Sequence, residues 1–192
     1  EAASLPEDCF RSLHHVLLDS QSFFSKIENI GKKRFYNTIA YLATSSKKIS
    51  YLSCGIGNCK KKVNESNGAF YCERCQSIIE DPQYRFMADL ELVDSHEKLY
   101  GRIFGNENCS AIFGNNVEEL EALQSVDEEL FEEKLKTNYF RDFCVRLMAR
   151  KDFFEGEEKV GFEITKMVPF DLCTPSIVAK ASRHLASLID NS

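Results

Sequence analysis

The chain has 192 residues and a mass of 22.0 kDa, a length typical of one domain with a small insertion. With 43% hydrophobic and 28% charged residues and only 9 Gly and 4 Pro, its composition excludes fibrous and disordered chains. No apolar run approaches the ~20 residues that cross a bilayer, so no membrane partner is expected. A net charge of -6 argues against a uniformly basic nucleic-acid-binding surface.

Charge is distributed unevenly along the chain. Residues 1–75 hold 11 Lys and Arg against 7 Asp and Glu, whereas residues 76–192 hold 13 against 23. Because phosphate binding depends on a local basic face, the acidic total weakens a nucleic-acid hypothesis without removing it. The first eight residues carry acids and a proline where a secretory signal carries bases and an apolar core, and the missing initial Met suggests a piece of a longer protein.

The first half of the chain favours one helix followed by strands. Apolar residues recur at spacings of three and four from Phe10 to Leu17, which predicts an amphipathic helix over residues 6–20. Aromatic and β-branched residues, or alternation of apolar and polar residues, then predict four strands, at residues 35–44, 49–53, 84–93 and 99–104. The long gap between the second and third of these strands holds an insertion.

The second half changes to helical periodicity and back. Apolar residues predict one or two helices over residues 111–137, and the eight acids between Glu118 and Glu133 are interpreted as a solvated helix face. An acidic turn at 152–158 then joins two further strands, at residues 139–150 and 159–168. Several short strands interrupted by helices predict a small antiparallel barrel, so the fold class is mainly β with helices.

A last helix is predicted over residues 174–190. Thr174 is a suitable N-cap, and Pro175 occupies the first helical position, where its missing N–H costs nothing. The helix carries one apolar stripe, formed by Ile177, Val178, Ala181, Leu185, Leu188 and Ile189. Periodicity alone leaves open whether this stripe packs on the barrel or joins an intersubunit bundle.

Four of the eight cysteines fall within residues 54–75, in the spacing C-x4-C-x12-C-x2-C. Two close pairs separated by a loop are typical of paired zinc knuckles; the ligands here are Cys54, Cys59, Cys72 and Cys75. Gly55 and Gly57 allow a sharp turn in the first knuckle, and Asn67-Gly68 is a strong hairpin-turn signal. We predict one structural Zn²⁺, because four thiolates leave no open coordination position; two disulfides or four free thiols are the alternative.

The remaining cysteines have no knuckle partners. They are Cys9, Cys109, Cys144 and Cys173. Cys144 lies in the apolar alternation of a predicted strand and is interpreted as a buried core thiol. Reduced thiols together with zinc indicate an intracellular compartment.

Several segments in order resemble a known family. Residues 54–63 (CGIGNCKKKV), Asn67-Gly68, 71–75 (YCERC), 84–86 (YRF) and 138–141 (NYFR) closely resemble the C-terminal single-stranded-DNA-binding domain of the replication protein A large subunit. The likeness covers most of the chain from about Ser22 onward. A meiotic or telomerase-associated paralogue of that subunit shares the same skeleton.

The resemblance implies a single OB-fold domain over residues 1–192, a five-stranded barrel with an inserted zinc ribbon at 54–75. It implies single-stranded DNA binding in replication, repair or recombination, and a nuclear location. It further implies assembly with two smaller OB-fold subunits into a heterotrimer through the helix at 174–190. The alternative is a protein-interaction scaffold with little DNA binding of its own.

The resemblance also implies which residues contact DNA. Phe104 and Phe154 would stack on bases, with Phe153 replacing Phe154 after a one-residue slip in register. The phosphate contacts would come from basic residues, namely Lys47, Lys48, Lys60, Lys61, Lys62, Arg85, Arg102 and Arg146. The alternative for each aromatic residue is a position in the core. The alternative for the lysine run is a solvated loop that does not contact DNA. The four acids of the turn at 152–158 would repel phosphate.

An enzyme is the least favoured class. The sequence holds no H-E-x-x-H, P-loop, G-x-S-x-G or dinucleotide fingerprint. Its four histidines are not spaced around the cysteines as a catalytic metal site requires. We therefore expect a binding protein without catalytic residues.

Overall fold

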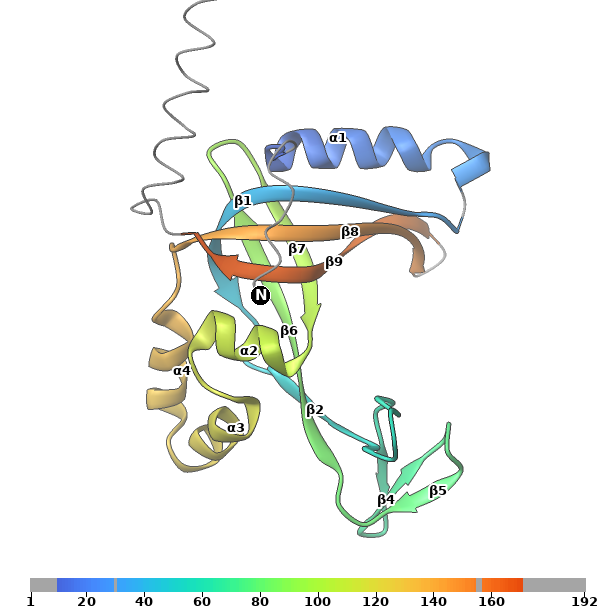
Figure 1. The fold of residues 1–192 in the computed structure, drawn as a ribbon, viewed down its shortest axis with the longest axis vertical. Helices are drawn as coiled ribbons and strands as arrows, with labels where there is room; N and C mark the ends of the chain where they lie inside the picture. Colours follow the sequence, from blue (N-terminus) through green and yellow to red (C-terminus); the bar gives the residue numbers. More distant parts are fainter. Residues whose placement is uncertain (1–9, 30, 155–156, 171–192) are drawn as a thin grey trace, which may run out of the picture.

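Five strands of the computed structural model form a barrel (Figure 1). The structure describes residues 10–29, 31–154 and 157–170, so the predicted helix at 174–190, with its apolar stripe, and Cys9 and Cys173 lie outside the described residues. The barrel strands are β1 (Lys33–Ser45), β6 (Gln83–Val93), β7 (Lys98–Phe104), β8 (Asp142–Phe154) and β9 (Glu157–Pro169). Their order is β1-β8-β9-β7-β6, and β6 pairs back to β1. The predicted OB-fold barrel is confirmed.

The barrel closes because β1 serves two neighbours. Its first part pairs antiparallel with β8, and its last part pairs antiparallel with β6. A shift in register between Leu42 and Thr44 lies where β1 pairs with β6, and such bulges increase the bend of a strand. On the opposite side, β7 and β9 run parallel through Arg102–Glu163 and Ile103–Ile164 pairs. Each strand therefore buries one set of alternating side chains inside the barrel.

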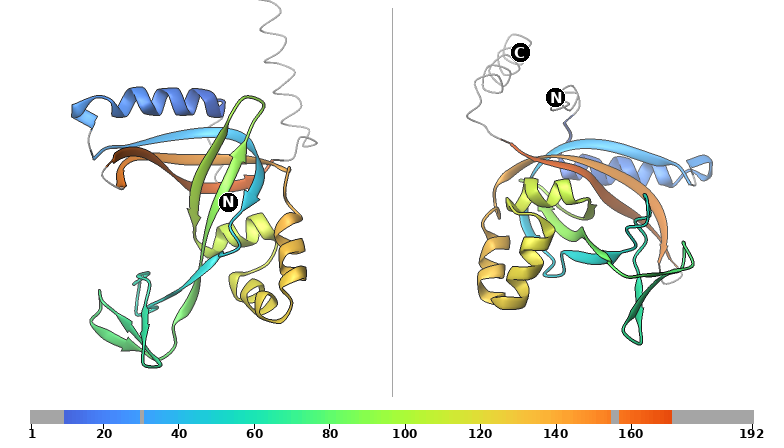
Figure 2. Two further views of the ribbon diagram at one scale, coloured as in Figure 1. Left: turned by 180° about the vertical axis from the view of Figure 1, so that it is seen from behind. Right: turned by 60° about the horizontal axis from the view of Figure 1, so that its bottom comes forward.

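Three helices interrupt the barrel between β7 and β8. They are α2 (Asn106–Phe113), α3 (Val117–Val126) and α4 (Glu128–Lys136), and they lie at the end of the barrel away from α1 (Figure 2). The prediction of one or two helices from residue 111 missed the first of them. Its N-cap is Gly105, which offers no side-chain hydrogen bond, so the sequence carries no start signal there.

Helix α1 (Leu13–Phe24) covers the other end of the barrel, followed by the 3-10 turn η2 (Ile27–Asn29). The prediction of a helix over residues 6–20 was wrong in its bounds, because Ser12 is the N-cap and the helix runs on to Phe24. Asp94, in the turn after β6, accepts a hydrogen bond from the Leu13 N–H at 2.7 Å. The first turn of α1 is thereby held to the β6–β7 hairpin.

A second anchor of α1 is a polar cluster around Asp19. Its carboxylate accepts hydrogen bonds from the Arg34 Nε at 2.7 Å and the Tyr36 hydroxyl at 2.8 Å. Arg34 also lies 4.8 Å from the centre of the Phe23 ring. Burial raises the pKa of Asp19, but the hydrogen bonds from Tyr36 and Arg34 outweigh it and hold the pKa below its usual value.

The inserted ribbon forms a second, smaller sheet. Strand β2 (Ser50–Ser53) extends the barrel sheet beside β6, and the chain then builds β3 (Asn64–Ser66), β4 (Ala69–Cys72) and β5 (Ser77–Ile79). These three strands project from the barrel on the extended ends of β2 and β6 (Figure 1). The small sheet reaches past residue 75, where the predicted ribbon ended.

Two further predictions need correction. Cys144 is half-buried, because its neighbours Phe143 and Val145 take the inward positions of β8. The acidic turn at 152–158 is shorter than predicted, since β8 runs to Phe154 and β9 starts at Glu157. Among the described helices, none is long and apolar enough to cross a membrane.

Candidate functional site

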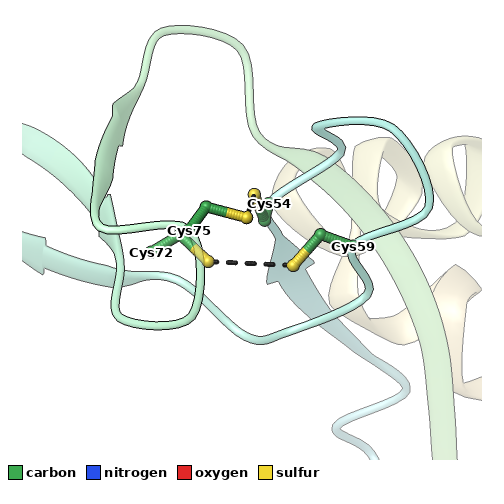
Figure 3. Close-up of side chains that lie close together, drawn as sticks. All are labelled: Cys54, Cys59, Cys72 and Cys75. Carbon is green, nitrogen blue, oxygen red and sulfur yellow. Dashed lines mark hydrogen bonds between the residues drawn. The ribbon is translucent and has the colours of Figure 1, made fainter.

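The four knuckle cysteines converge at the junction of ribbon and barrel (Figure 3). Cys54 follows β2 and Cys59 closes the next loop, while Cys72 ends β4 and Cys75 lies in the turn before β5. All four Sγ atoms lie within 4.8 Å of one another. The distance is 3.7 Å between the Sγ atoms of Cys54 and Cys75, and 3.8 Å between those of Cys59 and Cys72.

The backbone of the first knuckle, and of the hairpin between the two cysteine pairs, has the conformation that the glycines were predicted to supply. Gly55 and Gly57 have φ of 68° and 53°, a region that side chains with a Cβ rarely adopt. Asn67 and Gly68 both have positive φ, 52° and 77°, which is the pattern of a type I′ hairpin turn. These turns bring cysteines from two separate loops to one point.

The cysteine cluster fits a tetrahedral metal ion. Metal–sulfur bonds of about 2.3 Å place the sulfur atoms of a tetrahedral site about 3.8 Å apart, close to the two distances above. The backbone N–H groups of Cys75 and Arg74 lower the pKa of Cys72 to about 7, whereas the neighbouring thiols raise the pKa of Cys75 to about 12 and burial raises the pKa of Cys54, so the support for a metal comes from the sulfur geometry. The six described cysteines are all free, so the disulfide alternative is not what the structure contains.

A groove of about 260 Å³ runs along the outer face of β7 and β9, with one residue each from β6 and β8. Alternation along β7 buries Leu99, Gly101 and Ile103, so the residues between them point outward. Phe104 is 40% exposed in this groove, next to Arg102 on the same strand. The principal lining side chains are Asp89, Tyr100, Arg102, Phe104, Arg150, Phe162 and Glu163.

Arg102 is already bound to a carboxylate. Its Nε donates to Asp89 Oδ1 at 2.6 Å and its Nη2 donates to Asp89 Oδ2 at 3.0 Å. The hydrogen bond to Asp89 is the main cause of a raised Arg102 pKa. Tyr100 is similarly engaged, since its hydroxyl donates to Glu91 at 3.0 Å. The groove therefore combines exposed aromatic rings with neutralised charges.

A second groove, of about 730 Å³, lies between the ribbon and the barrel. Its basic lining residues are Lys47, Lys48 and Lys62, and its aromatic ones are Tyr51, Phe70 and Tyr84. Lys47 forms ion pairs with Glu132 and, at 3.7 Å, with Glu128, both on α4. The predicted residues Lys60 and Lys61 are exposed on the neighbouring ribbon loop. The structure thus gathers the predicted lysines on the ribbon side of the barrel.

The other predicted contacts are more scattered. Arg85 is half-buried on β6, and its Nε is buried without a hydrogen-bond partner in the described part of the chain. Arg146 lies on β8, with its guanidinium 5.2 Å from the centre of the Phe35 ring, and β9 separates it from β7. The strand position of Phe154 is opposite Glu157 at the end of the β8–β9 hairpin, and Phe153 precedes it. The structure does not bring Arg146 to the groove that holds Phe104.

Five of the first groove's side chains were missed by sequence reasoning. They are Asp89, Tyr100, Arg150, Phe162 and Glu163. The alternation that places Phe104 outward also places Tyr100 outward, so a period-2 count along β7 would have found it. Arg150 and Phe162 join the groove only because β8 and β9 close the barrel, which no local pattern shows.

Comparisons with known proteins agree with this architecture. A family model described as the replication factor-A C-terminal domain matches residues 34–176. The mouse replication protein A 70 kDa DNA-binding subunit is 28% identical over 152 residues, which cover 77% of this chain and 24% of that protein. Replication factor A protein 1 of Schizosaccharomyces pombe is 28% identical over 134 residues, which cover 70% of this chain and 22% of that protein. The chain thus spans about a quarter of the length of these curated relatives.

Two solved structures share the fold. A replication protein A heterotrimer bound to single-stranded DNA superposes with a TM-score of 0.74 at 24% identity, covering 93% of this chain and 39% of that one. Yeast replication protein A bound to single-stranded DNA gives a TM-score of 0.70 at 20% identity, covering 86% and 94%. At these identities the likeness establishes the fold.

Proposed function

Since the chain belongs to the replication factor-A C-terminal domain family, we propose that it is the single-stranded-DNA-binding and assembly domain of a replication protein A large-subunit-like protein. The observation that carries this proposal is the groove along the outer face of β7 and β9, where Phe104 is exposed and Tyr100 and Arg102 also line the groove. An OB-fold binds single strands by stacking bases on aromatic rings and tracking phosphates with basic groups. The relatives that share the fold are bound to single-stranded DNA.

In this proposal the first groove stacks bases and the second contacts phosphates. Phe104 stacks on a base in the first groove, and Phe154 adds a second ring from the β8–β9 hairpin. Lys48 and Lys62, in the second groove, contact phosphates where the strand leaves the barrel toward the ribbon, with Lys60 and Lys61 beside them. Stacking and backbone contacts read little base identity, so we expect little sequence preference.

We assign one Zn²⁺ to Cys54, Cys59, Cys72 and Cys75. The ion would supply four bonds that hold the ribbon loops together, and with four thiolate ligands it has no catalytic position. Support comes from the spacing of the four sulfur atoms, which suits a tetrahedral site. The ribbon is then a structural module that presents its lysines to the second groove.

Assembly and location complete the proposal. The apolar stripe at 174–190 would join two smaller OB-fold subunits in a heterotrimer, and a solved structure that shares this fold is that of a replication protein A heterotrimer. A protein of this family acting in replication, repair or recombination would work in the nucleus, and a meiotic or telomere-associated paralogue fits the same features. An assembly scaffold with little DNA binding is the second candidate, and the ion pairs that occupy Lys47 and Arg102 favour it.

Fluorescence anisotropy with a labelled oligonucleotide tests the proposal. We expect this chain to bind a pyrimidine single strand more tightly than a duplex of the same length, and to bind less tightly as salt rises, because phosphate contacts release counterions. Equal affinity for single strand and duplex would contradict the stacking mechanism. No measurable binding at low salt would favour the scaffold.

A further inference from the structure

Arg102 lines the first groove, and its cross-strand partner is an acid. Asp89 on β6 stands directly opposite Arg102 on β7 in the register of the hairpin. The two side chains form a bidentate pair, with N–O distances of 2.6 and 3.0 Å. Their exposed fractions are 52% and 56%, so the pair faces solvent within the groove where DNA is proposed to bind.

A second acid flanks Arg102 on its other side. Glu163 on β9 is the register partner of Arg102 in the parallel pairing and also lines the groove. The second arginine of the groove, Arg150, also takes part in an interaction within the protein, so it is not free either. Two arginines are therefore balanced by two acids, and the groove offers a phosphate no net positive charge.

We propose that Asp89 is an intramolecular competitor for the phosphate at Arg102, and that it sets the DNA affinity of this face. The inference rests on the proposed function and concerns how strongly that site binds. A guanidinium recognises carboxylate and phosphate with the same planar pair of N–H donors. In this structure Asp89 occupies the edge formed by Nε and Nη2, so a phosphate must displace the carboxylate or approach beside its negative charge.

Because the pair is exposed, Asp89 weakens phosphate binding at Arg102 without preventing it. An ion pair between exposed side chains is weak, because water and salt screen it. A phosphate can therefore exchange with Asp89 at modest cost. Base stacking on Phe104 and Tyr100 does not depend on this exchange, so the face binds chiefly through its rings, with a shallow dependence on salt.

Asp89→Asn tests the inference, because asparagine keeps the shape of the side chain and removes its charge. We expect the variant to bind a labelled oligothymidine more tightly at low salt, by up to about fivefold, the upper end for an exposed ion pair. The slope of log K against log salt should steepen by about 0.7, the value for one added phosphate contact on a single strand. Asp89→Ser, which removes both the charge and the hydrogen bonds, should tighten binding likewise.

Glu133→Gln is the matched control, since it removes one negative charge from an exposed position of α4. Its affinity should equal that of the wild type. Arg102→Gln completes a double-mutant cycle with Asp89→Asn. It should weaken binding little in the wild-type background. It should weaken binding more strongly in the Asp89→Asn background, where the guanidinium no longer has a carboxylate partner.

The outcomes separate this inference from the proposed function. If the wild type binds and Asp89→Asn matches Glu133→Gln, the competitor role is wrong while DNA binding stands. Weaker binding by Asp89→Asn would make Asp89 a residue that positions Arg102 for phosphate, which also overturns the inference. If no variant binds, the proposed function fails and the inference fails with it. Tighter binding by Asp89→Asn and Asp89→Ser, with Glu133→Gln unchanged from the wild type, supports both.

Discussion

Single side chains on β7 decide what the outer face of the barrel offers to a ligand. Phe104 is exposed although it is large and apolar, and its neighbour Ile103 is fully buried. A base that stacks on an exposed ring gains dispersion contacts and removes apolar surface from water. The ring is therefore a candidate for function rather than for the core.

Phe104→Ala should weaken binding of single-stranded DNA by about 1 to 3 kcal/mol, the usual value of one stacked base. Phe140→Ala is the matched control, because Phe140 is 74% exposed in the turn before β8. Anisotropy titrations and thermal melting of both variants provide the measurement. Equal affinities for the two folded variants would remove Phe104 from the interface.

Asp19 gives α1 a pH-dependent anchor. Its folded pKa lies below the unfolded value of 3.8, so the carboxylate adds stability above that value and loses it as pH falls through the folded pKa. We expect the Asp19 anchor of α1 to weaken below about pH 4. Asp19→Asn should destabilise the protein at neutral pH and reduce the dependence on pH in this window, measured by amide hydrogen exchange in α1 and by melting. An unchanged acid response would mean that other carboxylates govern it.

Among the elements, the ribbon has the weakest apolar support. Its buried cluster consists of Cys54, Cys59, Cys72, Val63 and Ile79, so three of its five members are predicted metal ligands. The barrel and its helices share a separate and much larger core. The ribbon should therefore depend on its metal, whereas the barrel should not.

Cys72→Ser, or removal of metal by a chelator, should unfold the ribbon and leave the barrel intact, because structural zinc contributes about 10 to 16 kcal/mol in isolated fingers. Hydrogen exchange should rise in β3, β4 and β5 and stay low in β1 and β8. Cys144→Ser, the same change at a half-buried position outside the cluster, should bind one zinc and keep the ribbon protected. A ribbon that remains protected without metal would contradict the zinc assignment.

The parallel contact between β7 and β9 closes the barrel at a tight point. A Cβ added at Gly101 would lie 3.0 Å from Ile164 Cγ1 and 3.2 Å from its Cδ1. Gly101→Ala should cost about 1 to 3 kcal/mol of stability through overpacking, measured as a lowered melting temperature. Adding Ile164→Val, which deletes Cδ1, should restore part of the loss. Without such recovery, the strain lies elsewhere.

Across the whole molecule, local patterns predicted what is decided locally. The period-2 alternation predicted β6 and β7, and the glycines predicted the turns of the ribbon. Each of these patterns reflects a backbone conformation that is fixed over a few residues. The start of α2 was missed because Gly105 provides no cap, and α1 was misplaced because Ser12 rather than a residue near Pro6 is its N-cap. The spacing of the four cysteines predicted their convergence for the same local reason.

The charge state of the site was not predictable in this way. Asp89 is 13 residues from Arg102, and Glu163 reaches it only through the parallel pairing that closes the barrel. Lys47 is a basic turn residue in the sequence, yet the helical insertion carries Glu132 to it. Which basic groups remain available for phosphate is therefore a property of the assembled fold.

The long separation between β1 and β8 also sets an order for synthesis. Residues from Lys33 onward pair with β8, and β7 pairs with β9, so the barrel stays open until the chain up to Pro169 has left the ribosome. The ribbon needs only the chain between Ser53 and Gln83, a short loop with a small closure cost. We expect the nascent chain to capture its metal and fold the ribbon first, so that β2 and the start of β6 are already adjacent when the barrel closes.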